Sequence, residues 1–584
     1  GLEFLWSQAA GLSEDGRYLL MTAQVPGEAH GSAHVVDRLT GVTVRVSAGF
    51  DGPGVGPSAI LSGDGRTVLF QTTSQSDGLR TYLVTLDADG DGLLDAWETA
   101  YGLDPSSPGD AALDPDGDGQ TNAQEFAAGT HPRATPVRYF AEGASGTFFD
   151  TGLAIFNPGP VTATVNVRFL GPDGATASHL LTVAAGTPVY FDASTLGLSF
   201  TEFSIVVESP VPLSVERRMT WDRTSAYGTH SGSGVAAPAT QWHFADGATI
   251  AGIQTFFLLQ NPGPTPALAT MRYLVADGTI EQRTHEVPGQ SRLTVWANQE
   301  GAPMQAAEFA TSITADVPIV AERAVYRDAQ GQTFGAGSVS AGTATPATVW
   351  RFAEGATGSY FDTFLMMTNP GVSPATVNVW YLRAGHADAL TGNTTRTYTV
   401  PPGRRHTIWV DREDPLLADV ALSVLVSSDV PIIAERAMWW PGPDAATWHG
   451  THAESGNDSG GTMLAVPDVE VGTTPDVETF VTIGSAARLG AQVRITAHLT
   501  DGRTLTRTFV AGNRFTLWPR HDFPETVGQR FALTVESLRV LLSPSPSLPY
   551  GRPPLAVEKV HYRGSFAAGD VSRATRLPDP VDEP

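Results

Sequence analysis

Residues 140–144 read Phe-Ala-Glu-Gly-Ala, and this stretch returns twice farther along the chain. It recurs as Phe-Ala-Asp-Gly-Ala at 244–248 and as Phe-Ala-Glu-Gly-Ala at 352–356, at offsets of 104 and 108 residues. A second motif, Asn-Pro-Gly, keeps the same offsets at 157–159, 261–263 and 369–371. Two motifs that hold one spacing across three copies indicate tandem structural repeats.

Within a repeat the sequence is typical of β-strands. Residues 163–169 and 375–381 alternate apolar and polar side chains, which predicts strands with one buried face. The apolar run at 364–367 predicts a strand buried on both faces. About seven strands in roughly 100 residues predict a β-sandwich of immunoglobulin-like size. The chain has no cysteine, so the Cys-Trp-Cys pattern of true immunoglobulin domains is absent and only the architecture is predicted.

Each repeat also carries a Glu-Arg pair near its end. The pairs are Glu216 with Arg217, Glu322 with Arg323 and Glu435 with Arg436, and a diverged fourth repeat keeps Glu558 with Lys559. Neighbours in a strand point to opposite faces, so the two side chains of a pair are not expected to share one cavity. We therefore favour structural ion pairs over catalysis. One member is expected to pair with a charged or backbone group of its own repeat, such as the Glu of Phe-Ala-Glu-Gly.

These repeats resemble the tandem Phe-Ala-Glu-Gly and Asn-Pro modules of secreted bacterial multidomain proteins. The resemblance covers residues 138–570, clearly for three copies and weakly for the fourth. The junctions between repeats are short and contain proline, at Pro238 and Pro346. Such junctions predict a stiff rod in which each module contacts mainly its neighbours.

Two stretches before the repeats fit the pattern Asp-x-Asp-x-Asp-Gly-x5-Glu without a gap. This twelve-residue loop offers calcium its oxygens from positions 1, 3, 5, 7, 9 and 12. The predicted ligands of the first loop are Asp87, Asp89, Asp91, the carbonyl of Leu93, Asp95 and Glu98. Those of the second loop are Asp114, Asp116, Asp118, the carbonyl of Gln120, Asn122 and Glu125. Residues 87–125 hold eleven acids and no Lys or Arg, a density that is costly without a cation because the carboxylates repel one another.

Short helices are expected beside these loops, one ending at Gly102 and a shorter one following Asn122. The whole segment resembles the thrombospondin type 3-like or dockerin-like calcium repeats of bacterial surface proteins. That resemblance implies Ca²⁺ as the cofactor. His131 stands where the closing Gly-Thr-Asp-Pro of such repeats has Asp, so no ligand is carried over to that position.

The first 86 residues contain a Ser-x-Asp-Gly-Arg turn twice, at 13–17 and 62–66, each followed by a short apolar strand. This resembles the blades of TolB-type β-propellers, which need about four to eight blades to close. About two are visible, so the chain is either the C-terminal part of a longer protein or its two units pack in another way. The predicted class is all-β, with tandem immunoglobulin-like β-sandwiches preceded by a calcium-binding loop segment and a partial propeller-like unit.

The predicted organisation follows from these motifs. It comprises a propeller-like unit at 1–86, a two-site calcium segment at 87–135, β-sandwich repeats at 136–240, 241–347 and 348–460, a diverged repeat at 461–575 and a tail at 576–584.

The composition and the missing motifs make several classes of function less favoured. The net charge of −25 disfavours nucleic acid and anionic membranes as partners, and no apolar run approaches the roughly 20 residues of a membrane span. No Walker motif, His-Glu-x-x-His or Gly-x-Ser-x-Gly is found, so an enzyme is the least favoured interpretation. We expect an extracellular or cell-surface bacterial protein, a calcium-stiffened rod that acts as a stalk, adhesin or fibre component and binds calcium and other subunits or a surface ligand.

Two alternatives stay open. The chain could be a subunit of an extracellular filament, joined through an edge strand or through the tail at 578–584. It could instead be a carbohydrate- or protein-binding array of a larger exported enzyme, for which exposed aromatics such as Trp439, Trp440 and Trp448 would argue.

Overall fold

The chain is described by a computed structural model. The described residues are 6–24, 31–40, 42–48, 59–74, 78–116, 120–222, 227–329, 331–384, 393–442, 447–485, 490–540, 552–564 and 566–578. Most of the predicted tail, 579–584, lies outside them. Within this part of the chain, no helix has the length and apolar character needed to span a membrane.

Each repeat forms two antiparallel sheets that enclose a core of their own. Repeat 1 consists of β8 (Thr135–Phe140), β9 (Phe149–Phe156), β10 (Ala163–Leu170), η2 (Pro172–Gly174), β11 (Thr176–Val183), β12 (Pro188–Asp192), η3 (Ala193–Leu196), β13 (Ser204–Ser209), β14 (Ser214–Trp221) and β15 (Gly228–Gly232). Its sheets have the orders β11-β10-β13-β8 and β12-β9-β14-β15. The all-β, sandwich-like class predicted from the alternating strands is therefore confirmed.

Repeats 2 and 3 have the same topology, with one long strand that runs through both sheets. Repeat 2 consists of β16 (Ala239–Phe244), β17 (Ile253–Asn261), β18 (Ala267–Val275), β19 (Ile280–Val287), β20 (Ser291–Trp296), η4 (Ala297–Gln299), η5 (Met304–Ala306), the long β21 (Phe309–Ala329) and β22 (Gln332–Ala341). Repeat 3 consists of β23 (Ala347–Phe352), β24 (Asp362–Asn369), β25 (Ala375–Arg383), β26 (Thr394–Val400), β27 (Arg404–Trp409), η6 (Val410–Arg412), η7 (Pro415–Leu417), the long β28 (Leu422–Trp440) and β29 (Gly450–Ser455).

The diverged repeat 4 keeps this strand order although its sequence motifs are gone. It consists of β30 (Met463–Val471), β31 (Val477–Ser485), β32 (Ala491–Leu499), β33 (Thr504–Ala511), β34 (Phe515–Leu517), α3 (Pro519–Asp522), η8 (Pro524–Thr526), β35 (Gln529–Val540), β36 (Leu555–Arg563), β37 (Ala568–Arg573) and β38 (Thr575–Arg576). Its sheets have the orders β33-β32-β35-β30-β38 and β34-β31-β36-β37. The last strand, β38, pairs with β30, so the start of the predicted tail is bound within the chain.

Four predicted boundaries are wrong by one or two residues, because each falls inside a strand. The boundary between residues 135 and 136 falls inside β8, that between 240 and 241 inside β16, that between 347 and 348 inside β23, and that between 575 and 576 inside β38. The prolines at 238 and 346 end the connections, and the first strand of the next repeat starts directly after each.

The Asn-Pro-Gly motif forms the predicted turn. In repeat 1 the Asn157 side-chain amide donates to the carbonyls of Val161 and Val183, and its oxygen accepts from the Gly159 N–H at 3.0 Å. The same three bonds form around Asn261 and Asn369. The Asn side chain therefore satisfies buried backbone groups at the end of one strand in three repeats, which explains why the motif recurs.

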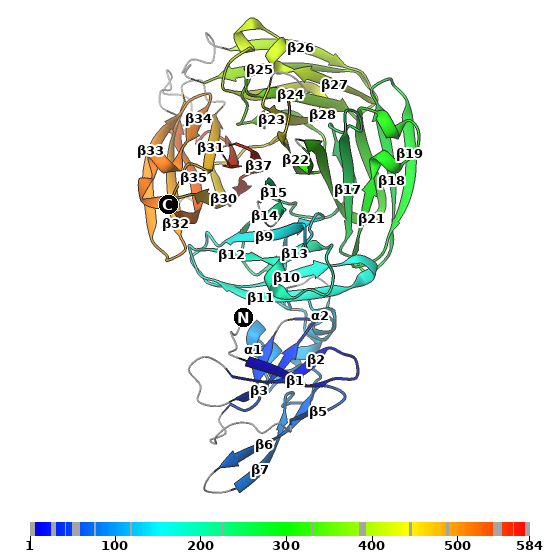
Figure 1. The fold of residues 1–584 in the computed structure, drawn as a ribbon, viewed down its shortest axis with the longest axis vertical. Helices are drawn as coiled ribbons and strands as arrows, with labels where there is room; N and C mark the ends of the chain where they lie inside the picture. The colour runs from blue at the N-terminus through cyan, green and yellow to red at the C-terminus, as the bar shows by residue number, and fades with distance from the viewer. Residues whose placement is uncertain are drawn as a thin grey trace.

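The four sandwiches are arranged as a closed ring rather than a rod (Figure 1). Strands β15, β22 and β37 lie around the centre. Together with β29 they form a circle of contacts, one strand from each repeat, in which each strand contacts the next and β37 contacts β15. Ser231 of β15 donates to Asp570 of β37 at 2.6 Å, and Arg573 of β37 pairs with Glu454 of β29 at 3.1 Å. The prediction of a linear rod is therefore wrong, because repeat 4 packs against repeat 1.

A buried chain of ion pairs runs around this ring. Arg217 pairs with Glu322 at 2.9 Å, Arg323 with Glu435 at 2.6 Å and Arg436 with Glu558 at 2.6 Å. Lys559, the only lysine in the sequence, pairs with Glu216 and closes the circle. Each cation thus reaches the carboxylate of the following repeat, and the members of one Glu-Arg pair bind different neighbours.

The Phe-Ala-Glu-Gly motif supplies backbone partners to this chain. Arg217 donates to the Glu142 carbonyl at 2.7 Å, and the Glu142 N–H donates to Glu322 at 2.7 Å. Asp246 and Glu354 make the corresponding pairs of bonds in the next two repeats. The arginine therefore binds a backbone group of its own repeat, as predicted, and its charge is balanced by the next repeat.

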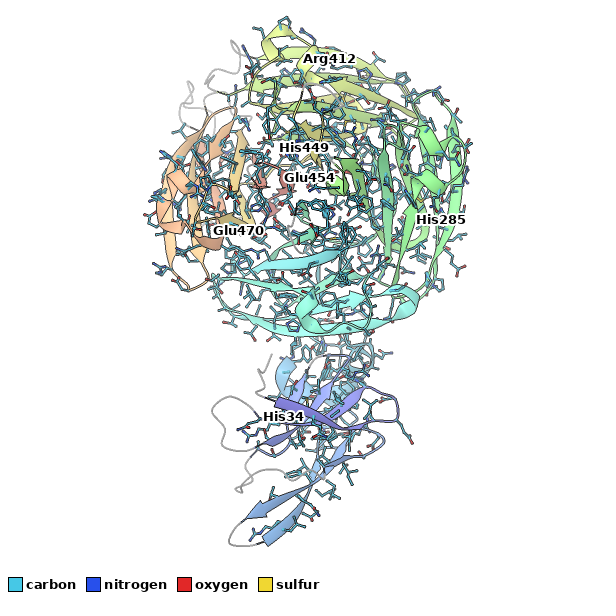
Figure 2. The ribbon with its side chains drawn as sticks, viewed as in Figure 1. His34, His285, Arg412, His449, Glu454 and Glu470 are labelled. Atoms are coloured by element: carbon cyan, nitrogen blue, oxygen red, sulfur yellow. The ribbon has the colours of Figure 1, made fainter. Side chains whose placement is uncertain are left out.

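The contact between repeats 4 and 1, here called the closing seam, contains further buried ion pairs. Arg218 pairs with Asp468 and Glu470, each at 2.7 Å, and Lys559 also contacts Asp570 at 3.1 Å. Glu470 lies on the inward side of repeat 4 (Figure 2). Burial raises the pKa of Glu470, but Arg218 and Arg563 outweigh burial and bring this pKa down to about 2.

The N-terminal unit projects from the ring beside repeat 1 (Figure 1). It contains β1 (Trp6–Leu12), β2 (Tyr18–Gln24), β3 (Ser32–Asp37) and β4 (Thr43–Arg45) as one antiparallel sheet, then β5 (Ile60–Leu61), β6 (Thr67–Ser74) and β7 (Gly78–Thr85) as a second. Both Ser-x-Asp-Gly-Arg turns fold alike: Ser13 and Ser62 donate to Asp15 and Asp64, and the following Gly has a positive φ.

We predict that Lys559→Met lowers the free energy of unfolding by about 3–5 kcal/mol, because it leaves Glu216 and Asp570 buried without a cation. Chemical denaturation of the variant measures this. Arg503→Met, which removes an exposed cation paired with Asp501, is the control and is expected to cost less than about 1 kcal/mol. Equal effects of the two substitutions would contradict the importance of the closing pair.

A second prediction concerns the stability of the folded protein at acidic pH. Because the pKa of Glu470 lies below its ordinary value of 4.5, this residue stabilises the folded ring fully above pH 4.5 and loses that effect as pH falls toward 2. The stability difference between the wild-type protein and Glu470→Gln should therefore be largest above pH 4.5 and vanish near pH 2. Denaturation across this range tests it, with Glu286→Gln on exposed β19 as the control. A pH-independent difference would contradict the assignment.

Candidate metal centre

The first predicted loop folds around its own carboxylates. Asp87 accepts hydrogen bonds from the N–H groups of Gly90 and Gly92, at 2.8 and 3.2 Å, and Asp89 and Asp91 each accept from the N–H two residues on. Gly92, at position 6, has a φ of 102°, which a residue with a side chain rarely adopts. The turn therefore directs the oxygens of Asp87, Asp89 and Asp91 to one place, with one oxygen of each within 4.8 Å of the others.

Glu98 joins this cluster from a helix. It lies on α1 (Asp95–Tyr101), which ends at Gly102 in the left-handed conformation, as the sequence predicted. One oxygen each of Asp91, Glu98 and Asp110 lies within 4.8 Å of the others. Glu98 is fully buried, and neither of its carboxylate oxygens has a hydrogen-bond partner in the described part of the chain. Burial, and then the neighbouring Asp91 and Asp89, raise the pKa of Glu98 to about 8.

Asp110 is a member of the site that the twelve-residue pattern does not contain. It lies on η1 (Asp110–Ala112), in the connection between the two loops, and is buried. One of its oxygens accepts from the Asp104 N–H at 3.1 Å, and the other has no partner among the described residues. Its only sequence signal is that it is an acid in the linker, which also holds the exposed Asp104.

The predicted ligand Asp95 is placed differently. Its carboxylate accepts from the Ala88 N–H at 2.7 Å, closing the loop, and it is not in either group of converging acids. Leu93, at position 7, buries its side chain in the core of the N-terminal unit.

The second predicted loop is described in part. Asp118 lies outside the described residues, and neither Asp114 nor Asp116 belongs to a group of converging acids among the described residues. The predicted carbonyl ligand Gln120 follows directly after the undescribed residues 117–119. Asn122 and Glu125 lie buried on α2 (Asn122–Ala128), which ends at Gly129 and has the same length as α1. The Asn122 amide donates to the Asp110 carbonyl at 2.8 Å, which ties α2 to the first site.

The residues of the first site fit a hard cation. All its candidate ligands are oxygens, several are buried and lack a donor, and ionised carboxylates at such distances repel one another. Calcium accepts six to eight oxygens in flexible geometry, whereas magnesium demands a near-ideal octahedron. The donor set of Asp87, Asp89, Asp91, Glu98 and Asp110 therefore suits calcium.

The site sits at the junction between the N-terminal unit and the ring. On one side Arg66 donates to the Gly92 carbonyl at 3.0 Å, and on the other Asn166 of repeat 1 donates to the Gly129 carbonyl at 3.0 Å. The two helices pack through Trp97 and Phe126, with ring centres 5.1 Å apart. His131 is buried against Tyr101, and burial lowers the pKa of His131 to about 4, so it packs as a neutral ring.

Comparisons with known proteins do not assign the chain to a family. No family model and no curated protein matches the chain. Among solved structures it is similar to a Thermotoga maritima 1070 protein (17% identity, 18% of this chain and 94% of that one, TM-score 0.17) and to an Anabaena sensory rhodopsin transducer (21%, 16% and 95%, 0.13). It also aligns with a tetra-tandem repeat from the extending region of a large adhesion protein (12%, 72% and 92%, 0.09). At these TM-scores the likenesses assign neither fold nor function.

We predict that Asp110→Asn weakens calcium binding by about tenfold or more, because it removes a converging charge from the site. Calorimetric titration with calcium measures this. Asp104→Asn, in the same connection but exposed, keeps the backbone N–H that binds Asp110 and should bind calcium like the wild type. Unchanged affinity in Asp110→Asn would restrict the site to the twelve-residue loop.

Proposed function

We propose that this chain is an extracellular structural protein in which calcium fixes an N-terminal β unit onto a closed ring of four β-sandwiches. The observation that carries the proposal is the buried group formed by Asp91, Glu98 and Asp110, whose unpaired oxygens call for a cation. These residues lie in the segment that joins the two parts. A bound cation would thus order the joint rather than catalyse a reaction.

The chemistry of the site supports an extracellular location. Extracellular calcium modules bind in the range of about 10⁻⁴–10⁻³ M, concentrations met outside cells. The absence of cysteine is compatible with export, and the net charge of −25 disfavours nucleic acid as a partner. A ring with a projecting unit presents a broad, rigid surface, which suits an adhesin or scaffold that holds other subunits or a surface ligand.

The proposal predicts that calcium stabilises the joint. Calcium at about 100 times Kd should add about 2.7 kcal/mol to the stability of the N-terminal unit, and chelator should remove it. Thermal melts with calcium and with chelator, together with hydrogen exchange over α1 and α2, measure the effect. The ring, which holds none of these ligands, should melt alike in both.

Glu98→Gln separates calcium from other causes. This variant keeps the size of the side chain but removes the carboxylate, so calcium should no longer raise the melting temperature of the joint. Glu286→Gln makes the same change at an exposed position of β19 and should respond to calcium as the wild type does. Absence of binding at millimolar calcium in the wild type would overturn the proposal.

A further inference from the structure

A cavity of about 400 Å³ opens between repeats 1 and 2. Its wall is largely aromatic, with Phe148 and Phe149 from repeat 1 facing Phe256, Tyr326 and Phe334 from repeat 2. Phe149 and Phe334 are stacked, with ring centres 6.3 Å apart. The volume lies in the range of small-molecule sites.

A second cavity, of about 320 Å³, opens between repeats 2 and 3. Phe364, Trp409, Trp439 and Trp448 of repeat 3 line it. Trp439 and Trp448 are stacked at 5.1 Å with an angle of 25° between their planes. Two of the three tryptophans singled out in the sequence therefore lie at one cavity, whereas Trp440 is fully buried and donates to the Phe566 carbonyl.

The two cavities are built from the same strand positions. Phe256 pairs with Trp296 across strands β17 and β20, and Phe364 pairs with Trp409 in the same register of β24 and β27. Three residues after the buried arginine comes Tyr326 in one repeat and Trp439 in the next. The matched lining positions are Phe256 and Phe364, Tyr326 and Trp439, Arg292 and Arg405, Thr294 and Thr407, Glu142 and Asp246, and Glu202 and Glu308. An accidental gap in packing would not repeat in this way.

Each cavity also holds buried polar groups. Arg292 donates to the Gly143 carbonyl at 2.9 Å and to Thr294 at 2.7 Å, yet its buried Nε has no partner among the described residues. Arg405 donates to Asp246 at 3.4 Å, and its Nε is likewise buried without a described partner. The indole Nε1 of Trp409 is also buried and has no hydrogen-bond partner among the described residues.

These groups select the chemistry of a ligand. A purely apolar molecule would cover the guanidinium and the acids that line each cavity without giving them a polar partner, which is costly. A cation would meet a guanidinium in each cavity, and an anion would meet two acids, Glu142 with Glu202 or Asp246 with Glu308. A neutral ring with apolar faces and hydroxyl groups at its edge suits both the aromatic walls and the mixed polar groups of the lining.

We propose that the two cavities are equivalent binding sites for a neutral hexose-sized saccharide unit. The ring face would lie on the half-buried Phe256 in one cavity and on the half-buried Phe364 and Trp409 in the other, and its hydroxyl groups would face the guanidinium of Arg292 or of Arg405. The inference goes beyond the proposed function and does not depend on calcium. The closing seam has no such wall, since Gly152 and Thr220 take the places of Phe256 and Tyr326.

The test uses the full chain with calcium. Glucose, galactose, mannose, N-acetylglucosamine, cellobiose and chitobiose are titrated by calorimetry, and saturation-transfer NMR reports which sugar protons contact the protein. We expect binding of at least one of them at millimolar concentration, with transfer to ring C–H protons. The methyl glycosides of the same sugars mimic a saccharide unit within a glycan chain, because their anomeric oxygen is substituted. Binding of the methyl glycosides therefore indicates a glycan ligand, whereas binding of the free sugars alone indicates that the anomeric hydroxyl is needed.

Variants locate the binding. Arg292→Gln and Arg405→Gln should each lower the number of saccharides bound per chain by one, or weaken one site more than tenfold. Arg494→Gln, which changes an exposed side chain of β32 in repeat 4, should bind as the wild type does. Circular dichroism checks that each variant is folded. If a variant does not fold, the inference is judged by the saturation-transfer NMR result on the wild-type protein. Absence of binding across the panel, or equal binding by all three variants, would overturn the inference. Glu98→Gln should bind saccharide normally, which separates this test from that of calcium.

Discussion

The ring depends on a constraint of electrostatics: a buried charge must have a partner. Arg217, Arg323 and Arg436 are each almost completely buried, and each finds its carboxylate in the following repeat. A linear array would leave Glu216 of repeat 1 and Lys559 of repeat 4 without these partners. Since an unpaired buried charge costs several kcal/mol, closing the ring removes a penalty at both ends of the array. The hydrophobic cores belong to the single repeats, whereas the ion pairs define how the repeats are arranged.

In the candidate metal centre Glu98 and Asp110 are buried with no partner of opposite sign in the described part of the chain. Asp91, Glu98 and Asp110 bring three carboxylates together with no cation among them in the described residues. Burial and this repulsion raise the pKa of Glu98, which means that the folded site without metal disfavours its own ionised form. Calcium would convert that repulsion into attraction. Under the proposed function the joint would therefore respond to calcium, whereas the charges at the contacts between repeats are already paired within the ring.

The sequence allowed the sandwiches, the strand alternation, the Asn-Pro-Gly turns and the helix end at Gly102 to be predicted, because each depends on local pattern. The ring could not be predicted in the same way, because its closure depends on Lys559 of repeat 4 binding Glu216 of repeat 1, and no local pattern reveals that contact. Glu558 with Lys559 persists in a repeat that has lost Phe-Ala-Glu-Gly and Asn-Pro-Gly, and this was the available sign that the pair serves contact between repeats. Asp110 was missed because the calcium pattern counts positions within one loop, whereas this candidate ligand lies in the connection after the loop.

The departure of repeat 1 from the other repeats follows from its place beside the closing seam. Repeats 2 and 3 present Ala324 and Ala437 directly after the buried arginine, next to aromatic walls, but repeat 1 has Arg218 there. Arg218 binds Asp468 and Glu470 of repeat 4, and a Phe at the position of Gly152 would occupy the same face of the neighbouring strand. The three other boundaries are joined in order along the chain, whereas the seam has to be found by two ends that are far apart in sequence. Charged partners suit that role, because any misaligned closure would bury Arg218, Asp468 or Lys559 unpaired, while aromatic surfaces tolerate a shift in register.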